Sequence, residues 1–153
     1  MLLARSPAVA LRETHPWWTG DNAEDLAEYL HRFEAGGYPV HQVVQARCPF
    51  CESNAFRALV DGEEGCVQRR CVMCGSIQFV ADSHEGWDHA RPEPLICPCG
   101  AEVFELSVGF SMRPDGEVRW ISVGARCLTD GVLGVCADWE ISYGPTQHLF
   151  TEV

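Results

Sequence analysis

The sequence predicts a small α+β protein that is mainly β, with one N-terminal helix followed by two tandem antiparallel β units. Apolar residues recur clearly at helical spacing just after residue 21. From Val40 onward, short runs rich in β-branched and aromatic residues alternate with turn residues. Cysteine motifs occur in both halves of this β region, which indicates that one unit is present twice.

Composition narrows the class of protein. The 153 residues include 46% hydrophobic and 22% charged residues, which suits one domain or two very small ones. The formal net charge is −11, and all 11 basic residues are arginine. Phosphate-loop, Schiff-base and lysine-base chemistries are therefore excluded, because each uses a lysine. The negative charge also repels a phosphate backbone, which disfavours nucleic acid as a partner.

Cysteine content and the first residues indicate where the protein works. The nine cysteines are an odd number, and such a set binds metal in a reducing compartment but forms disulfides outside the cell. Arg5 and Pro7 interrupt the N-terminal residues before a signal-like stretch of about 7 apolar residues accumulates. Every apolar run falls short of the roughly 20 residues that span a bilayer. We therefore expect a cytoplasmic protein that makes no membrane contact.

Residues 1–39 are predicted to form an irregular arm followed by the helix. The arm lacks periodicity, and the indoles of Trp17 and Trp18 are expected to pin it to the body of the protein. Asn22 can cap the helix, and two consecutive glycines end it. The helix has one apolar face, formed by Leu26, Tyr29, Leu30 and Phe33.

Seven β-strands are predicted after the helix, at residues 40–47, 55–60, 66–71, 76–81, 101–112, 117–126 and 132–139. Asp61-Gly62 and Pro114-Asp115-Gly116 stand where hairpin turns belong. The strands form two units, residues 40–82 and residues 95–153, and the second has an extended hairpin. The segment 83–94 between them is rich in charge, histidine and proline, and is predicted to be a linker loop.

The two units match when the sequence is compared with itself at an offset of 56 residues. Residues 71–82 then lie over residues 127–138, with a cysteine, a glycine, an apolar alternation, an alanine and an aspartate in common. Upstream, the Cys-Pro-Phe-Cys motif of the first unit corresponds to a Cys-Pro-Cys motif with one residue fewer. The second unit is therefore predicted to be a degenerate copy of the first.

Four cysteines of the first unit have the spacing of a metal site. Cys48 and Cys51 form one pair, and Cys71 and Cys74 form another 19 residues later. Two tight turns that each carry Cys-x-x-Cys supply the four tetrahedral ligands of a structural Zn²⁺. A thioredoxin-like redox pair and two buried disulfides are the competing interpretations. The strand-like flanks of both pairs favour zinc, although iron also fits four thiolates.

The Cys-Pro-Phe-Cys and Cys-Val-Met-Cys-Gly motifs resemble the two knuckles of zinc-ribbon or rubredoxin-like domains. The resemblance covers residues 48–82 closely and residues 97–139 more loosely, and residues 118–139 are also similar to small bacterial proteins of unassigned function. It implies two tandem zinc ribbons. Such a resemblance implies a fold and a metal, and it implies no activity.

The second unit offers a less regular ligand set. Cys97, Cys99 and Cys127 occupy three ligand positions, and Asp130 stands where the repeat requires the fourth cysteine. A carboxylate can bind zinc, so a second, weaker site is expected. The alternative is that this unit has lost its metal and that Asp130 only shapes the turn. Cys136 could substitute as a ligand, but its place in a strand favours packing.

Other residues have a functional and a structural interpretation. Cys66 is either a thiol activated by nearby arginines or an inert strand residue. His84 and His89 either bind metal with neighbouring carboxylates or belong to a hydrated loop. Trp17, Trp18 and Trp87 lie in irregular segments and are candidates for contact with a partner. Two further tryptophans, Trp120 and Trp139, lie on predicted strands and are expected to pack over the second unit.

Three functions remain open from the sequence. The first is a structural-zinc module that acts through protein–protein interaction, as an adaptor, a regulator, or an immunity or inhibitor protein. The second is a nucleic-acid-binding ribbon of transcription or RNA metabolism. That function requires a local basic patch, for which the candidates are Arg57, Arg69, Arg70, Arg119 and Arg126. The third is an enzyme that uses the second metal site, although no complete catalytic set can be assembled.

Overall fold

The computed structural model describes residues 11–14 and 17–153 of the chain. Most of the predicted N-terminal arm, with Arg5 and Pro7, lies outside these residues. The described residues form one antiparallel sheet with one longer helix and several short helical turns. None of the helices that the structure describes combines the length and the apolar character needed to cross a membrane.

Helix α1 spans Ala23–Phe33 and begins at the predicted cap. The Asn22 side chain accepts a hydrogen bond from the Asp25 backbone N–H at 2.9 Å. The Asp25 carboxylate in turn accepts from the Asp21 backbone N–H at 2.7 Å, so both side chains satisfy donors at the helix start. The helix is followed by the 3-10 turn η2 (Ala35–Gly37), where the two glycines have positive φ.

The N-terminal arm differs from its prediction. It contains two short strands, β1 (Arg12–Thr14) and β2 (Trp17–Thr19), which pair with each other. β2 also adds to the edge of the main sheet, where Trp18 is opposite Leu133. Part of the arm predicted to be irregular is therefore an antiparallel extension of the sheet.

The remaining strands are β3 (Gln42–Gln45), β4 (Phe56–Asp61), β5 (Cys66–Cys71), β6 (Ile77–Phe79), β7 (Glu93–Pro94), β8 (Phe104–Met112), β9 (Val118–Cys127) and β10 (Val132–Glu140). All seven strands predicted after the helix are present, some of them shorter than expected. The hairpin turns fall at the expected places, where Asp61 and Asp115 accept hydrogen bonds from backbone N–H groups two residues later.

The strands of both predicted units belong to one sheet. Its order is β1-β2-β10-β9-β8-β4-β5-β6, with β3 beside β8 and β7 beside β4. β3 was predicted to belong to the first unit, but it pairs with β8 of the second, with Val44 opposite Val108. β4 meets β8 where Phe56 is opposite Phe104. The sheet is therefore continuous across the boundary that the sequence predicts.

Residues 83–94 form more structure than the predicted linker loop. They contain the short helix α2 (Ser83–Gly86), the 3-10 turn η3 (Trp87–His89) and strand β7. The Ser83 hydroxyl accepts a hydrogen bond from the Val67 backbone N–H of β5 at 2.9 Å. A further 3-10 turn, η4 (Gln147–Thr151), lies near the end of the described chain.

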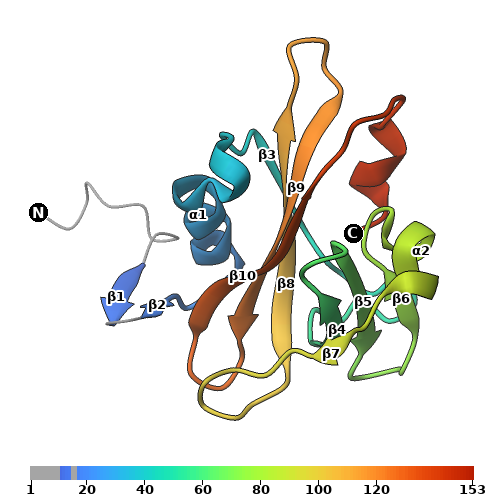
Figure 1. Cartoon of the computed structure of the whole chain (residues 1–153). Helices are drawn as coiled ribbons and strands as arrows, with labels where there is room; N and C mark the ends of the chain where they lie inside the picture. The colour runs from blue at the N-terminus through green and yellow to red at the C-terminus, as the bar shows by residue number, and fades with distance from the viewer. Residues whose placement is uncertain (1–10, 15–16) are drawn as a thin grey trace, which may run out of the picture.

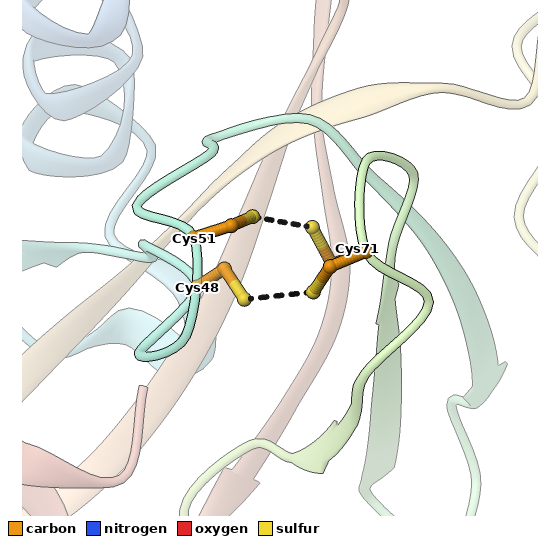
Figure 2. A group of neighbouring side chains, drawn as sticks. Cys48, Cys51 and Cys71 are labelled. Atoms are coloured by element: carbon orange, nitrogen blue, oxygen red, sulfur yellow. Dashed lines mark hydrogen bonds between the residues drawn. The ribbon is translucent and has the colours of Figure 1, made fainter.

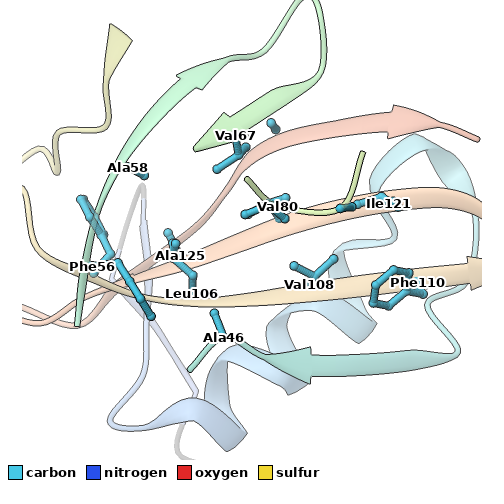
Figure 3. Close-up of a cluster of buried hydrophobic side chains, with 14 of the residues drawn as sticks. Ala46, Phe56, Ala58, Val67, Val80, Leu106, Val108, Phe110, Ile121 and Ala125 are labelled. Atoms are coloured by element: carbon cyan, nitrogen blue, oxygen red, sulfur yellow. The ribbon is translucent and has the colours of Figure 1, made fainter. Parts of the chain in front are cut away.

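The main core lies between the β4–β5 hairpin and the long strands β8 and β9 (Figure 3). Its largest fully buried side chains include Phe56, Leu106, Val108, Phe110 and Ile121. A second cluster joins Leu26 and Tyr29 of α1 to Leu133 of β10. In Figure 1, α1 and the short strands β4–β6 accordingly lie on opposite sides of β8–β10.

The two predicted units have the same strand register. Cys71 is opposite Phe56 in the first unit, and Cys127 is opposite Phe104 in the second. The third strands also agree. β6 pairs with β5, and β10 pairs with β9, and each paired residue of the second unit lies 56 residues after its equivalent in the first. Equivalent residues of the two units can therefore be compared directly.

We expect Phe56→Ala to lower the free energy of unfolding by roughly 3–5 kcal/mol, because the side chain is fully buried between the two units. Urea denaturation of the metal-loaded protein measures this loss. Phe50→Ala is the matched control: Phe50 is 73% exposed, so a change within about 0.5 kcal/mol is expected. Equal losses in both variants would contradict the packing described here.

Candidate metal centres

The four cysteines of the first predicted site converge. Cys48 and Cys51 lie on a turn after β3, and Cys71 and Cys74 lie on the turn between β5 and β6. The Sγ atoms of Cys48 and Cys74 are 3.5 Å apart, and those of Cys51 and Cys71 are 3.4 Å apart. In Figure 2, Cys48 and Cys51 point from their loop toward Cys71 on the facing hairpin.

These sulfur separations fit a tetrahedral metal ion. A Zn–S bond of about 2.3 Å places two tetrahedral ligands about 3.8 Å apart, whereas a disulfide requires about 2.05 Å. All four Sγ atoms lie within 4.8 Å of one another, and all nine cysteines of the chain are free. Neither pair opens a helix, so the site lacks the setting of a thioredoxin-like redox pair. The four thiols could hold a metal ion.

Backbone hydrogen bonds hold both turns of this site in the same shape. The Cys48 N–H donates to Ser53 O, and the Cys71 N–H donates to Ser76 O, each at 2.9 Å. The Gly75 N–H then donates to Cys71 O at 2.9 Å. Gly75 has φ +79°, a conformation that favours glycine and that lets the tight turn close.

The thiols of the first site differ widely in pKa. The Ser76 hydroxyl, followed by the backbone N–H groups of Phe50 and Cys51, lowers the pKa of Cys48 to about 6. The Ser53 N–H lowers the pKa of Cys51, but neighbouring thiols and burial raise it to about 12. Four thiols this close cannot all ionise without a cation, because like charges repel. Binding of a divalent metal is therefore expected to release protons.

Arg69 is a buried arginine next to this site, with no ion pair to an acidic side chain among the described residues. It is 2% exposed, and its guanidinium carbon lies 4.5 Å from the ring centre of Phe56. Its Nη2 donates to the main-chain oxygens of Val153 at 2.8 Å and Arg47 at 3.3 Å. Its Nε and Nη1 are buried without a hydrogen-bond partner in the described structure. A buried charge of this kind is costly unless an opposite charge compensates it.

A metal ion held by the four thiolates of the first site would supply that opposite charge. Burial lowers the pKa of Arg69, and the thiolates of Cys48 and Cys71 raise it back in part. Four thiolates around one divalent cation carry two net negative charges. The guanidinium, whose Nε and Nη1 have no hydrogen-bond partner in the described structure, therefore fits a loaded first site. The sequence held a signal for this placement, because Arg69 and Cys71 are two residues apart on one strand and must face the same side.

The second predicted site also converges. Cys97 lies 3.5 Å from an Asp130 carboxylate oxygen, and the Sγ atoms of Cys99 and Cys127 are 3.7 Å apart. All four ligand atoms lie within 4.8 Å of one another. In both groups the first and third ligands are buried and the other two are exposed, so each site opens to solvent along one edge.

Asp130 shapes the turn and also lies where it could bind a metal ion, so its position suits both roles that the sequence left open. Its Oδ1 accepts a hydrogen bond from the Val132 N–H at 3.1 Å, which shapes the turn, while the same carboxylate faces Cys97. Burial raises the pKa of Asp130, but the Val132 N–H and the thiols of Cys127 and Cys97 outweigh burial and bring the pKa below its usual value. The group is thus a carboxylate at neutral pH, the form that binds metal.

The backbone frames of the two sites agree closely. The Cys97 N–H donates to Ala101 O at 2.8 Å, and the Gly131 N–H donates to Cys127 O at 2.9 Å, as their equivalents do in the first site. One difference concerns charge: Ala125 occupies the position of Arg69 in the second unit. The second site therefore lacks the buried positive charge that lies beside the first.

The other cysteines and histidines lie outside both ligand groups. Burial raises the pKa of Cys66, and the nearby Asp61 raises it further, so its thiol is not activated. Burial also raises the pKa of Cys136 to about 12, as suits a packing residue. Among the described residues, neither His84 nor His89 belongs to a group that could hold a metal ion.

The candidate tryptophans differ in exposure. Trp17 is 45% exposed and borders an apolar cavity of about 250 Å³ beside Cys97. Trp18 packs against the α1 cluster, and Trp87 lies edge-on to Phe79 at 5.2 Å. Trp139 donates a hydrogen bond from Nε1 to Asp82 Oδ1 at 3.0 Å, so it contacts the first unit as well as its own.

The five candidate arginines do not form one basic patch. Arg69 is buried, Arg126 forms an ion pair with Glu105 at 2.8 Å, and Arg119 lies over the ring of Tyr38. The remaining two, Arg57 and Arg70, are exposed neighbours on β4 and β5.

Comparison with protein-family models, with curated proteins and with solved structures finds no match for this chain. The fold and the two ligand groups are therefore interpreted from their own geometry.

We expect Arg69→Met to weaken metal binding at the first site roughly tenfold or more, because a buried interaction with a charged group is worth roughly 1.5–3 kcal/mol. Competition with a metal-sensitive dye measures the affinity. Arg70→Met is the matched control, since Arg70 is the exposed neighbour on the same strand. An equal effect of the two substitutions would show that Arg69 does not compensate the cluster.

Proposed function

We propose that this chain is a zinc-dependent binding module in which two tandem zinc ribbons, each held by one structural Zn²⁺, present surfaces to another protein. The ribbons correspond to residues 40–82 and 95–153, joined through residues 83–94. The protein acts as an adaptor, a regulator, or an immunity or inhibitor protein in the cytoplasm, where its thiols stay reduced.

The single observation that carries the proposal is the pair of four-ligand groups. Each group provides four protein donors, which fill a tetrahedral shell and leave no coordination position for a substrate. Such closed sites stabilise a fold, whereas catalytic zinc sites use three protein ligands and one water. An enzyme that uses the second site would first have to release Asp130, so this remains a minor alternative.

The shared register of the two units supports the tandem arrangement. Val72 N–H donates to Ala55 O at 3.0 Å, and Leu128 N–H donates to Val103 O at 3.1 Å, at equivalent positions. The equivalent residues Phe56 and Phe104 also pair with each other between β4 and β8. This contact has the self-complementary form expected when two copies of one unit associate.

Exposed apolar side chains around both metal groups support a protein partner. Phe50 and Met73, on the two turns of the first site, are 73% and 74% exposed. Ile96 and Leu128, which adjoin the second site, are also exposed. Apolar groups held in place by rigid turns are suited to a protein interface. The net charge and the separation of the arginines give less support to nucleic acid.

We expect protein purified under reducing conditions to contain two zinc ions per chain, measured by inductively coupled plasma mass spectrometry. Asp130→Ala should lower the content to one, because it removes a ligand of the second site. Cys71→Ser should remove the ion of the first site and destabilise the β4–β5–β6 strands, because ligand loss sacrifices metal-binding free energy.

Cys66→Ser is the matched control, since Cys66 lies on the same strand as Cys71 and outside both groups; its zinc content should stay at two. Unchanged content in Asp130→Ala would remove the second site from the proposal. Iron in place of zinc would keep the fold and change the cofactor. Affinity capture that recovers nucleic acid and no protein would contradict the proposed partner class.

A further inference from the structure

One face of strands β4–β6 is exposed and carries two adjacent arginines. Arg57 is opposite Arg70, and Arg70 is opposite Ile77, so the three residues form a row across the strands. We call Arg57, Arg70 and Ile77 the arginine row. All three are exposed, and together with Leu59 and Pro94 they line a groove of about 310 Å³.

The arginine row is electrostatically unusual for this protein. Like charges directly opposite on neighbouring strands destabilise a sheet, and the chain carries a net charge of −11. Within the described residues, neither Arg57 nor Arg70 forms an ion pair. Glu102 also borders the groove, but it is not within ion-pair distance of either arginine.

In the second unit, the charged side chains at the equivalent positions form an ion pair and hydrogen bonds within the chain. Its equivalent row is Glu105, Arg126 and Leu133, in the same register relative to the site cysteine. Arg126 Nε donates to Glu105 Oε1 at 2.8 Å, and Asn54 Nδ2 donates to Glu105 Oε2 at 2.8 Å. A buried carboxylate thus occupies the position that Arg57 occupies in the first unit.

The second unit also has a cover over this face. Leu133 is 3% exposed, because Leu26 and Tyr29 of α1 and Trp18 of β2 pack on it. Ile77, its equivalent in the first unit, is 52% exposed. The second unit therefore receives a carboxylate and an apolar cover from this chain, whereas the first unit presents the same framework with neither.

We propose that the arginine row is the docking surface for an acidic and apolar segment of a partner protein. A carboxylate of that segment binds between Arg57 and Arg70, and a neighbouring apolar side chain covers Ile77 and Leu59. The segment thereby supplies to the first unit what Glu105 and α1 supply to the second. This inference rests on the proposed function and names the partner chemistry and the face that binds it.

A protein segment fits this surface better than a nucleic acid does. The surface offers two free arginines beside apolar side chains, which matches one carboxylate with apolar neighbours. A nucleic acid strand would bring a series of phosphates toward a protein whose net charge is −11, and repulsion grows with each phosphate. Glu102, which borders the groove, adds to that repulsion.

The test uses the full-length, zinc-loaded protein and a blocked pentapeptide of alternating glutamate and leucine as the probe. We expect it to shift the NMR signals of the Arg57 and Arg70 side chains. Arg57→Glu should weaken binding at least tenfold, because the new carboxylate occupies Arg70 as Glu105 occupies Arg126. This substitution is expected to leave folding intact. Arg70→Gln provides a second variant, with the same expected loss of peptide affinity.

Arg32→Glu is the matched control for charge, since Arg32 is exposed on α1, and it should change the affinity less than twofold. Absence of peptide binding, equal binding of a glutamine–leucine peptide, or tighter binding of hexathymidylate would overturn the inference. A wild-type dimer that Arg57→Glu dissociates would also overturn it, in favour of a second copy as occupant. Zinc content is measured on the same samples. If the peptide does not bind while two zinc ions are present, the docking surface is wrong and the proposed metal sites stand. If the zinc is absent, the proposed function itself fails.

Discussion

The convergence of two groups of four side chains, each able to hold a divalent cation, is the constraint on which this structure depends. Cys48, Cys71, Cys97 and Cys127 are at once candidate ligands and members of the buried core. Each joins a turn to the inner face of the sheet, so a bound metal would fix the turns at the place where the apolar side chains meet. Without a cation, closely spaced thiols must share protons and repel as thiolates. A bound metal would thus link local turn geometry to packing of the sheet.

The two units use one framework with different charges. In the first, Arg69 lies buried beside the cluster, and Arg57 and Arg70 stand exposed on the other face of the same hairpin. In the second, Ala125 replaces the buried arginine, and Glu105 with Arg126 forms an internal ion pair. The first unit therefore combines a buried positive charge beside its candidate metal site with an open outer face. The second is built into the core through α1, and its outer face is already covered.

Local sequence patterns predicted the features that depend on neighbours in the chain. The Asn22 cap, the strand centres and the two ligand sets follow from spacing, because a helix, a strand and a knuckle each impose their own period. The pairing of β3 with β8 and the addition of β2 to β10 could not be predicted in this way, since they join distant segments. The arginines differ from this case, because a local signal was present: Arg69 and Arg70 are neighbours in sequence, and strand parity relative to Cys71 separates the buried one from the exposed one.

X-ray absorption at the zinc edge tests the proposed metal coordination most directly, because it reports the atoms bound to the ion. Two loaded sites with seven thiolates and one carboxylate predict a shell dominated by sulfur at about 2.3 Å with a minor oxygen contribution at about 2.0–2.2 Å. A shell dominated by nitrogen or oxygen would contradict the proposed coordination. So would reduced protein that holds no transition metal and yet keeps both turns folded.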